Sequence, residues 1–394
     1  YDKRNQVSFV SQGIISNLAG QKSVLFQSSY SSVEELKEAG LNMQMETVIE
    51  EIDTNHKKVF YRRNNSKKTK VTDYDKLILA TGSYPAMTSV PFDKKSNLYF
   101  LKSMEDAIKA EEFLATAKNI AVIGGGMTGV EVARITQDRG IQTTLIHRNK
   151  NLLNDYLDEP ASRLLESWMN AEGTRLLLNT EVTEISVDGE NTVVQTANGQ
   201  KIAVDGVIFT IGFRPNSYLL NQQVELGDRG AVVVDEYMQT SCPDVFAVGD
   251  VSTTYVNLLE ENRYLPHASD AVRDGEIAAI NLLEARQKIT STQGTYHVPM
   301  KNLVMAMTGI TMKQAVDFGY DADAVHLLNE HLEGRLPSNV WMIYERRTHQ
   351  ILGLQCIGKT SDMAEYVNIF SLAIQQQLRI EDIEFTDFYF EHGY

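Results

Sequence analysis

The sequence predicts an α/β fold in which two similar parallel-sheet units precede a C-terminal α+β region. Three observations support this prediction: short β-rich runs alternate with helical stretches, one such run leads into a glycine-rich loop, and a strand motif occurs twice. The chain has 394 residues, 43% of them hydrophobic and 23% charged, which is enough for two or three packed domains.

The clearest unit begins with an apolar strand at residues 119–123. The loop 124–129 follows, then a helix at 130–139 and a second strand at 142–146. The loop glycines fit the dinucleotide-binding fingerprint, in which they permit a tight turn, close approach of a pyrophosphate and close helix packing. The phosphate would lie at the positive end of the helix. A purely structural glycine turn is the alternative, but the flanking strand and helix favour nucleotide binding.

A strand motif occurs at residues 75–85 and again at 205–215. Both copies have the pattern Asp-x-(Leu/Val)-Ile-x-(Ala/Thr)-x-Gly-x-x-Pro and lie 130 residues apart. Each indicates a buried strand that ends on a glycine and turns at a proline, so the copies predict two Rossmann-like units. By the spacing of the second unit, the glycine loop of the first falls before Tyr1. We therefore expect the sequence to be part of a longer chain.

Local patterns predict further elements. Ser32 and Glu35 form a capping box for a short helix that closes at Gly40, and residues 158–171 and 361–378 have the spacing of amphipathic helices.

A second candidate ligand site follows the apolar strand at 245–248. Gly249 and Asp250 come directly after this strand, at the carboxyl end where open α/β sheets bind ligands. A surface Gly-Asp turn is the alternative, and the apolar strand before it argues against that interpretation.

Charge and cysteine content exclude several classes of protein. The net charge of −15 disfavours general binding of nucleic acids or anionic membranes, and no apolar run approaches the roughly 18 residues of a membrane span. The basic residues within 57–70 indicate an exposed hairpin turn rather than a nucleic-acid patch. The two cysteines, Cys242 and Cys356, exclude a disulfide scaffold and a multi-cysteine metal site, so we expect no metal and a cytoplasmic location.

The residues after the strand 142–146 indicate which nicotinamide cofactor binds. An acid there would bind a ribose hydroxyl of NADH, whereas a basic residue suits the 2′-phosphate of NADPH. This chain has His147 and Arg148 and no carboxylate at that point. We therefore expect NADPH in preference to NADH; in the alternative, Arg148 is only a solvated loop residue.

Taken in this order, the motifs resemble the FAD-dependent pyridine nucleotide-disulfide oxidoreductases, especially the branch of NADH peroxidase, NADH oxidase and coenzyme A-disulfide reductase. The resemblance rests on residues 80–82, the glycine loop with Glu131, residues 212–216 and residues 240–250, and it covers nearly the whole chain. It implies a homodimer in which hydride passes from NADPH to FAD and then to a small-molecule electron acceptor. The implied domains are an FAD domain (1–117 and 216–293), an NAD(P) domain (118–215) and an interface domain (294–394).

The resemblance also implies roles for individual residues. The helix beginning near His267 would direct its positive end at the flavin, and Gly212 with Tyr156 would flank the nicotinamide nucleotide. The implied catalytic positions are Gln12 and Glu131. The implied FAD-binding residues are Asp2, Lys3, Ser11, Gln12, Ile49, Ala80, Thr81, Gly82, Ser83, Gly249, Asp250, His267 and Ala268. The implied NAD(P)-binding residues are Gly124, Gly126, Met127, Thr128, Gly129, Glu131, His147, Arg148, Tyr156 and Gly212.

Three positions depart from the family pattern. The family's redox cysteine lies in a Ser-Phe-x-x-Cys-Gly stretch, and here residues 8–13 place Gln12 at that point. Met127 replaces a tyrosine common in relatives, and residues 329–338 lack the tyrosines that coenzyme A-disulfide reductases have there. Because an amide forms neither a thiolate nor a disulfide, we expect direct electron transfer to oxygen, a quinone or another small acceptor. Reduction of coenzyme A disulfide or another disulfide, and a non-catalytic redox sensor, are the alternatives.

Overall fold

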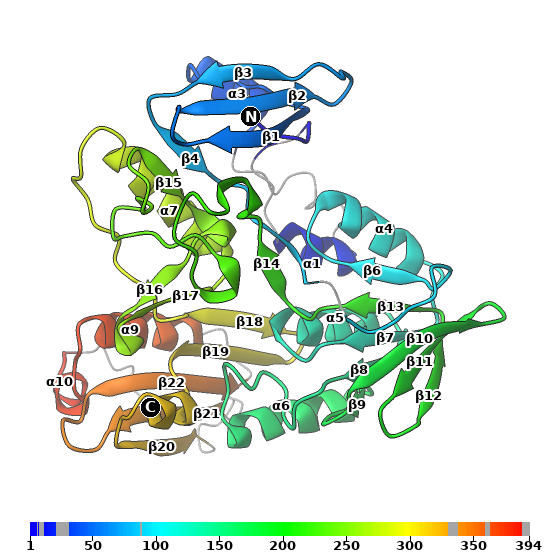
Figure 1. The fold of residues 1–394 in the computed structure, drawn as a ribbon. Coiled ribbons are helices and arrows are strands. Elements are labelled where there is room, and N and C mark those ends of the chain that lie inside the picture. Colours follow the sequence, from blue (N-terminus) through cyan, green and yellow to red (C-terminus); the bar gives the residue numbers. More distant parts are fainter. Residues whose placement is uncertain are drawn as a thin grey trace.

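Three units make up the molecule (Figure 1). The computed structural model describes residues 1–5, 7, 12–20, 31–86, 89–329, 338–358 and 363–387. Two units contain parallel strands and the C-terminal one contains an antiparallel sheet with helices, which confirms the predicted fold class. The first unit comprises residues 1–86 and 216–293, the second residues 98–215, and the third residues 294–387.

The second unit is built on a five-stranded parallel sheet with the order β6-β13-β7-β8-β9. The predicted strands are present as β7 and β8, and α5 begins at Met127, inside the predicted loop 124–129 and three residues earlier than expected. The sheet strands are β6 (Leu98–Phe100), β7 (Asn119–Ile123), β8 (Gln142–Ile146), β9 (Arg175–Leu177) and β13 (Gly206–Phe209), and the helices are α4 (Met104–Leu114), α5 (Met127–Asp138) and α6 (Glu159–Ala171). An antiparallel meander of β10 (Val182–Asp188), β11 (Asn191–Thr196) and β12 (Lys201–Val204) precedes β13.

One domain boundary differs from the prediction. The predicted FAD domain runs to residue 117, but β6 pairs in parallel with β13, with Leu98 opposite Val207. The backbone of β13 thereby finds hydrogen-bond partners on both sides, from β6 and from β7. β6 and the helix α4 after it therefore belong to the second unit, and the boundary lies before Leu98.

The first unit has a meander and a parallel strand pair. β2 and β3 are antiparallel, with Lys58 opposite Asp73, so the basic segment is a hairpin as predicted. Ser32 and Glu35 form the predicted capping box. The elements are α1 (Gln12–Leu18), α3 (Val33–Glu38), β1 (Thr47–Asp53), β2 (Lys58–Arg63), β3 (Lys70–Asp73), β4 (Leu77–Leu79), β15 (Val245–Ala247), β16 (Thr254–Val256), β17 (Glu261–Arg263) and α7 (Ala268–Asn281).

The two copies of the repeated motif meet in space. After β4 and Gly82, residues Ser83–Pro85 form β5; after β13 and Gly212, residues Phe213–Pro215 form β14. These two short strands are antiparallel partners of each other. Each parallel-sheet unit therefore extends one strand to the other, and the carboxyl ends of β4 and β13 lie next to this crossing.

The third unit is an antiparallel sheet with the order β18-β19-β22-β21-β20. The helix predicted at 361–378 is α9, and it packs against β19 and β22. In β21, Trp341 and Ile343 are buried, whereas Val340, Met342 and Tyr344 on the other face are only half-buried. The elements are β18 (Tyr296–Met300), β19 (Leu303–Gly309), α8 (Met312–Asp317), β20 (Ala322–Asn329), β21 (Ser338–Glu345), β22 (Ile351–Gly358), α9 (Met363–Gln375) and α10 (Ile380–Glu384).

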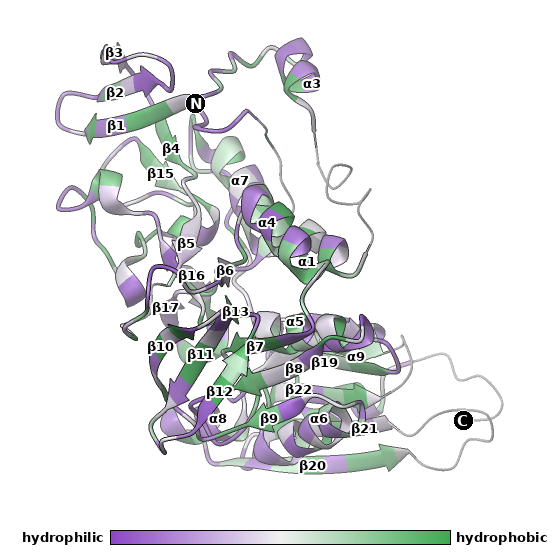
Figure 2. Ribbon diagram, turned by 90° about the vertical axis from the view of Figure 1, so that its right-hand side faces the viewer, coloured by the Kyte–Doolittle hydropathy of each residue, from purple (hydrophilic) through white to green (hydrophobic). Residues whose placement is uncertain are grey.

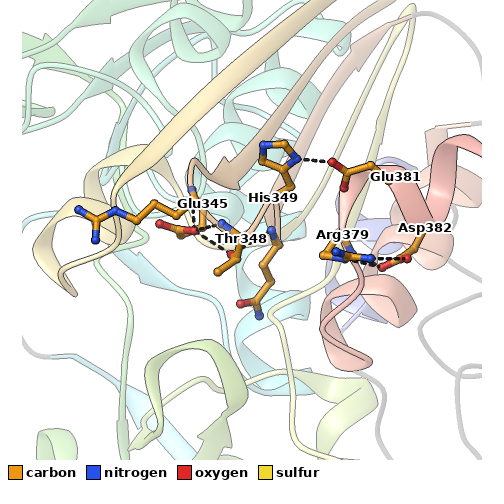
Figure 3. A network of polar contacts seen from close by, with 8 residues as sticks. Glu345, Thr348, His349, Arg379, Glu381 and Asp382 are labelled. Carbon is orange, nitrogen blue, oxygen red and sulfur yellow. Dashed lines mark hydrogen bonds and ion pairs between the residues drawn. The ribbon is translucent and has the colours of Figure 1, made fainter.

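A polar network ties the turn between β21 and β22 to α10 (Figure 3). The Glu345 carboxylate accepts hydrogen bonds from the Thr348 hydroxyl and backbone N–H and so closes the turn. The next residue, His349, has a φ of 59° and directs its Nδ1 at the Glu381 carboxylate at the start of α10. The last described helix is thereby held against the end of the sheet.

The helices in the described part of the chain have the character of helices that pack one face on a protein core. Figure 2 shows both hydropathy colours along α1 and α4, and α4 buries Ala107, Ala110 and Leu114 on one face. No helix in this part of the chain is long and apolar enough to cross a bilayer. Nor do the described residues gather three or more His, Cys, Asp or Glu side chains in an arrangement that could hold a metal ion.

Candidate functional site

The glycine loop after β7 turns tightly against the end of β13. Gly124 has a φ of 117°, a region that favours glycine, and a Cβ there would lie 2.5 Å from the carbonyl oxygen of Thr210. The Thr210 hydroxyl lies 3.1 Å from the carbonyl oxygen of Ile123 and 3.0 Å from that of Gly124, within donating distance of both. Because Thr210 belongs to the second copy of the repeated motif, that copy holds the loop in place.

The first turn of α5 has open backbone donors. Its N-cap is Gly126, which has no side chain to accept hydrogen bonds from the first-turn N–H groups. Together with the helix dipole, these N–H groups form a site for a phosphate. Gly129 permits the close approach of helix and loop, because a Cβ there would lie 1.9 Å from the carbonyl oxygen of Gly124. Met127 and Thr128 are half-buried in this turn.

The two residues after β8 have different surroundings. His147 is only 9% exposed, and its Nδ1 accepts a hydrogen bond from the Gly125 backbone N–H at 3.0 Å. Arg148 is exposed, and its guanidinium makes no hydrogen bond or ion pair with any described residue. The His147 ring therefore faces the glycine loop, while its predicted role in NAD(P) binding stays a prediction. The two residues differ in burial because β8 lies between β7 and β9 in the sheet, and the chain leaves the sheet at Arg148.

A carboxyl with a raised pKa lies in the second turn of α5. Burial raises the pKa of Glu131 to about 7, against a smaller opposing effect of Arg134. α1, which begins at Gln12, packs against α5, so the two predicted catalytic positions belong to neighbouring helices. The side chain of Gln12 and the whole of Ser11 lie outside the described residues.

The turn after β15 is held by side chains from distant segments. The Asp250 carboxylate accepts hydrogen bonds from the Ser83 hydroxyl at 2.8 Å and from the Lys102 ammonium at 2.6 Å. Gly249 has a φ of 69°, and its backbone N–H donates to an Asp274 carboxylate oxygen at 3.0 Å. The predicted residues Ser83, Gly249 and Asp250 therefore come together at one edge of the first unit.

Asp274, on α7, is a second carboxyl with a raised pKa. Burial raises its pKa to about 6, with a smaller opposing effect of the Gly249 N–H and a contribution from Asp270. One of its oxygens has no hydrogen-bond partner. α7 itself begins at Ala268 with His267 as an N-cap whose side chain makes no cap hydrogen bond, so its first-turn N–H groups are open.

Hydrogen bonds join the segment from Ala80 to Ser83 to Asn216, where the chain re-enters the first unit. The Thr81 hydroxyl donates to the backbone carbonyl of Asn216 at 2.8 Å, and the Asn216 backbone N–H donates to the Gly82 carbonyl at 2.9 Å. Gly82 has a φ of 65°. The predicted cluster at 80–83 is therefore a shaped turn at the carboxyl end of β4.

Residues from all three units meet in an aromatic cluster. The ring of Tyr296, on β18, lies 5.0 Å from that of Tyr156 and 5.0 Å from that of His267, edge-on in both cases. Burial raises the pKa of both tyrosines. Tyr156 is therefore placed between the second and third units, and Gly212, also predicted near the nicotinamide, lies exposed at the β5–β14 crossing.

The N-terminal residues run beside the meander. The Thr47 backbone N–H donates to the Asp2 carbonyl at 2.8 Å, and the Asp2 carboxylate accepts from the Arg4 backbone N–H at 2.9 Å. Lys3 is exposed and Ile49 is half-buried in β1. Asp2 and Ile49 thus share one edge of the first unit.

Three residues that contribute to these sites were not predicted from the sequence: Lys102, Asp274 and Thr210. Thr210 had a visible signal, since it occupies the Ala/Thr position of the repeated motif. Lys102 and Asp274 gave no such signal, because their partners are distant along the chain. Lys102 contacts Asp250, 148 residues away, and Asp274 contacts Gly249, 25 residues away.

Comparison with known proteins agrees with this arrangement. The family description pyridine nucleotide-disulphide oxidoreductase matches residues 4–275, and the dimerisation domain of that family matches residues 297–390. The chain belongs to this family. It is an FAD-dependent NAD(P)H oxidoreductase, as the resemblance implies.

Several relatives cover almost the whole oxidoreductase. An NADH oxidase of Enterococcus faecalis is 32% identical over 396 residues, which are 99% of this chain and 89% of that protein. An NAD(P)H coenzyme A polysulfide/persulfide reductase of Pyrococcus horikoshii is 26% identical over 363 residues, covering 89% and 79% of the two chains. The solved structure of a water-forming NADH oxidase from Lactobacillus brevis, bound to NADH, has a TM-score of 0.95 at 29% identity, covering 99% of this chain and 87% of that one. An engineered NADPH-bound form of that oxidase gives the same values.

The residues of this oxidoreductase fit both of its nucleotides. α5 and α7 each begin without a side-chain cap, which leaves backbone donors for a pyrophosphate or a flavin edge. Glycines at positive φ end the repeated strands at Gly82 and Gly212. Asp250 supplies a carboxylate at a strand end, which suits the hydroxyl groups of FAD.

Proposed function

We propose that this oxidoreductase is an NADPH oxidase that transfers electrons through FAD to molecular oxygen and releases hydrogen peroxide. The observation that carries the cofactor choice is the pair after β8, where His147 is neutral and buried and Arg148 is exposed and makes no hydrogen bond or ion pair with any residue that the structure describes. A free guanidinium binds a phosphate by charge-assisted hydrogen bonds. A carboxylate, which would repel that phosphate, is absent from this strand end.

An engineered relative supports the choice of NADPH. In that NADPH oxidase an aspartate was changed to alanine and the following alanine to arginine. The changed aspartate follows a changed glycine by 18 residues, which is also the spacing from Gly129 to His147 here. The arginine of the engineered protein therefore corresponds in spacing to Arg148.

The residues of the chain act on the nucleotides by position and charge. FAD, when bound, accepts a hydride from the nicotinamide and passes the electrons on to the acceptor. The α5 N-terminus and Arg148 would hold the pyrophosphate and 2′-phosphate, and Tyr156 would flank the nicotinamide. Glu131, with a pKa of about 7, can hold or release a proton near neutral pH beside the first turn of α5.

The choice of oxygen as acceptor rests on similarity to the NADH oxidases and on the residue at position 12. Gln12 cannot form a thiolate. Of the two cysteines, Cys356 is buried in β22 and burial raises its pKa to about 12, and Cys242 lies in the loop before β15. Two electrons reduce oxygen to hydrogen peroxide, and further reduction to water requires a second redox centre. We therefore expect peroxide, unlike the water-forming relatives.

We also infer that two chains pair through the third unit and that the enzyme works in the cytoplasm. The matched dimerisation domain supports pairing, as does the exposed apolar surface of α9, where Leu372 is 60% exposed. The two free cysteines support a reducing compartment. A monomer mass by light scattering at micromolar concentration would contradict the pairing, and localisation of the tagged native protein tests the compartment.

Kinetics with both cofactors test the function. We expect a higher kcat/KM with NADPH than with NADH, and about one hydrogen peroxide per NADPH consumed in air. Arg148→Ala should lower the NADPH-to-NADH ratio about 10-fold to 100-fold, the range for a lost charge-assisted hydrogen bond. Arg175→Ala is the matched control, because Arg175 is also exposed but lies at the amino end of β9, opposite Thr144, whereas Arg148 follows the carboxyl end of β8.

The rival functions give different results in the same assays. Faster flavin reoxidation by coenzyme A disulfide than by oxygen would favour a disulfide reductase, which the similarity to the Pyrococcus reductase makes the second candidate. A single flavin reduction without turnover would favour a redox sensor. Water in place of peroxide, or equal efficiency with both cofactors, contradicts the proposal.

A further inference from the structure

The His147 ring lies directly beneath the glycine loop. The Gly125 backbone N–H donates to Nδ1 at 3.0 Å, and a Cβ on Gly125 would lie 2.7 Å from the imidazole Cγ and 2.6 Å from Leu152. Gly125, the middle glycine of the loop, is therefore glycine because the imidazole and Leu152 occupy the space of its side chain. This side chain couples the loop to the end of β8, beside a hydrogen bond from the Gly124 backbone N–H to the Ile146 carbonyl at 2.9 Å.

The hydrogen bonds define the charge and tautomer of this imidazole. A backbone N–H can only donate, so Nδ1 carries no proton and the proton of the neutral ring is on Nε2. Nε2 lies 3.1 Å from the Asn154 side-chain oxygen, which accepts that proton. Burial lowers the pKa of His147; of the charged groups that face it, Arg148 lowers the pKa further and Asp155 opposes this.

The surroundings of Asn154 keep its oxygen aimed at the ring. That oxygen also accepts a hydrogen bond from the Asn149 side-chain amide at 2.8 Å, and the Asn154 amide nitrogen donates to the Asp155 carboxylate at 2.8 Å. The amide is thus fixed with its oxygen towards Nε2. Asn149, Asn154 and Asp155 therefore form a polar support that holds one tautomer of His147.

We propose that His147 is a positioning and specificity-determining residue that supplies the glycine loop with an uncharged acceptor. A carboxylate at this point could accept the same Gly125 N–H, but it would bring a negative charge beside the 2′-phosphate of NADPH. The imidazole keeps the loop in its pyrophosphate-binding shape without that charge and leaves Arg148 as the charged group at the surface. The specificity part of this inference rests on the proposed preference for NADPH, whereas the loop-holding part does not.

Substitutions at His147 separate the acceptor from the charge. Asparagine offers a neutral oxygen near the position of Nδ1, aspartate offers the same oxygen with a negative charge, and leucine offers no acceptor. The affinities of NADP⁺ and NAD⁺ are measured by titration calorimetry on the oxidised full chain, so that no turnover occurs. Circular dichroism and flavin content establish that each variant is folded and loaded.

The three variants have distinct expected results. His147→Asn should keep both dissociation constants within about 3-fold of the native values, because the acceptor is retained. His147→Leu should weaken both cofactors by a similar factor, about 10-fold, as expected for an unsatisfied loop N–H. His147→Asp should weaken NADP⁺ about 10-fold to 100-fold and NAD⁺ less than 3-fold.

A ¹⁵N NMR spectrum of the native chain tests the tautomer without any cofactor variant. The His147 signals, assigned by their loss in His147→Asn, should show an unprotonated Nδ1 and a protonated Nε2 at pH 7. A proton on Nδ1, or equal NADP⁺-to-NAD⁺ ratios in the Asp and Asn variants, would overturn the proposal. Tighter binding of NAD⁺ than NADP⁺ by the native chain would overturn the proposed function instead, and the tautomer and the loss in His147→Leu would still stand.

Discussion

The two copies of the repeated motif have the same sequence pattern and different surroundings. Ile208, in β13, is fully buried between β6 and β7, whereas its counterpart Ile78, in β4, is 38% exposed. Among the described residues β4 pairs only with β15. At the end of the strand, Thr210 approaches the glycine loop with its hydroxyl, and the matching Ala80 has none. A motif therefore specifies a strand and its turn, while the neighbours decide how much each residue contributes.

The largest expected effect concerns the two isoleucines. Ile208→Ala should lower the free energy of unfolding by about 3 kcal/mol, because it leaves a cavity where the side chain is fully buried against the five-stranded sheet. Ile78→Ala should cost less than about 1 kcal/mol, since the side chain is already part-exposed. Urea unfolding of both variants, followed by circular dichroism, gives the comparison. Equal losses would mean that the motif, and not its neighbours, sets the contribution.

The second effect concerns two carboxyl groups with a raised pKa, Asp274 in the first unit and Glu131 in the second. The pKa of Asp274 is about 6, above its ordinary 3.8, so the folded state binds this proton more tightly. The resulting stability is complete below pH 3.8 and is lost as the pH rises through 6, which leaves a cost of about 3 kcal/mol at pH 8. Asp274→Asn should therefore raise stability by about 1–2 kcal/mol at pH 8 and change little at pH 4. An amide retains an oxygen for the Gly249 N–H.

Glu131 provides the matched variant in the second unit. Its pKa is about 7, above its ordinary 4.5, so the corresponding stability is complete below pH 4.5 and is lost as the pH rises through 7, and Glu131→Gln should separate from the native chain over that range. Thermal unfolding across pH 4–9 compares the two variants. If Asp274→Asn destabilises the chain equally at every pH, the carboxyl acts by its hydrogen bond alone and its ionisation is irrelevant to stability.

The smallest expected effect comes from replacing Thr210 with alanine, the residue that the first copy of the motif has at the matching position, Ala80. Thr210→Ala should cost about 1 kcal/mol of stability and weaken NADP⁺ several-fold, because the hydroxyl no longer holds the glycine loop. Thr210→Ser keeps the hydroxyl and is the control. Unchanged NADP⁺ affinity in the alanine variant would show that the loop keeps its shape without this contact.

Sequence analysis could find whatever is encoded in adjacent residues. The strand 119–123, the loop glycines, the capping box of α3 and the strand–glycine–proline repeat all follow from local spacing, and the structure has them at those residues. The Asp205-to-Pro215 copy even showed that a second unit exists, because a buried strand, a positive-φ glycine and a proline turn are each local requirements.

Tertiary structure decided the remaining features. β6 joins the second sheet, β5 pairs with β14, and Lys102 reaches Asp250 through contacts between segments far apart in the chain. The sequence identified His147 as the residue that takes the place of an acid, but its inward direction depends on Gly125 leaving room for the ring and on Asn154 fixing its tautomer. The raised pKa of Glu131 likewise depends on packing around α5. Burial arises from the sum of distant neighbours, so local spacing specifies which residues are present and the assembled fold specifies what charge and direction they have.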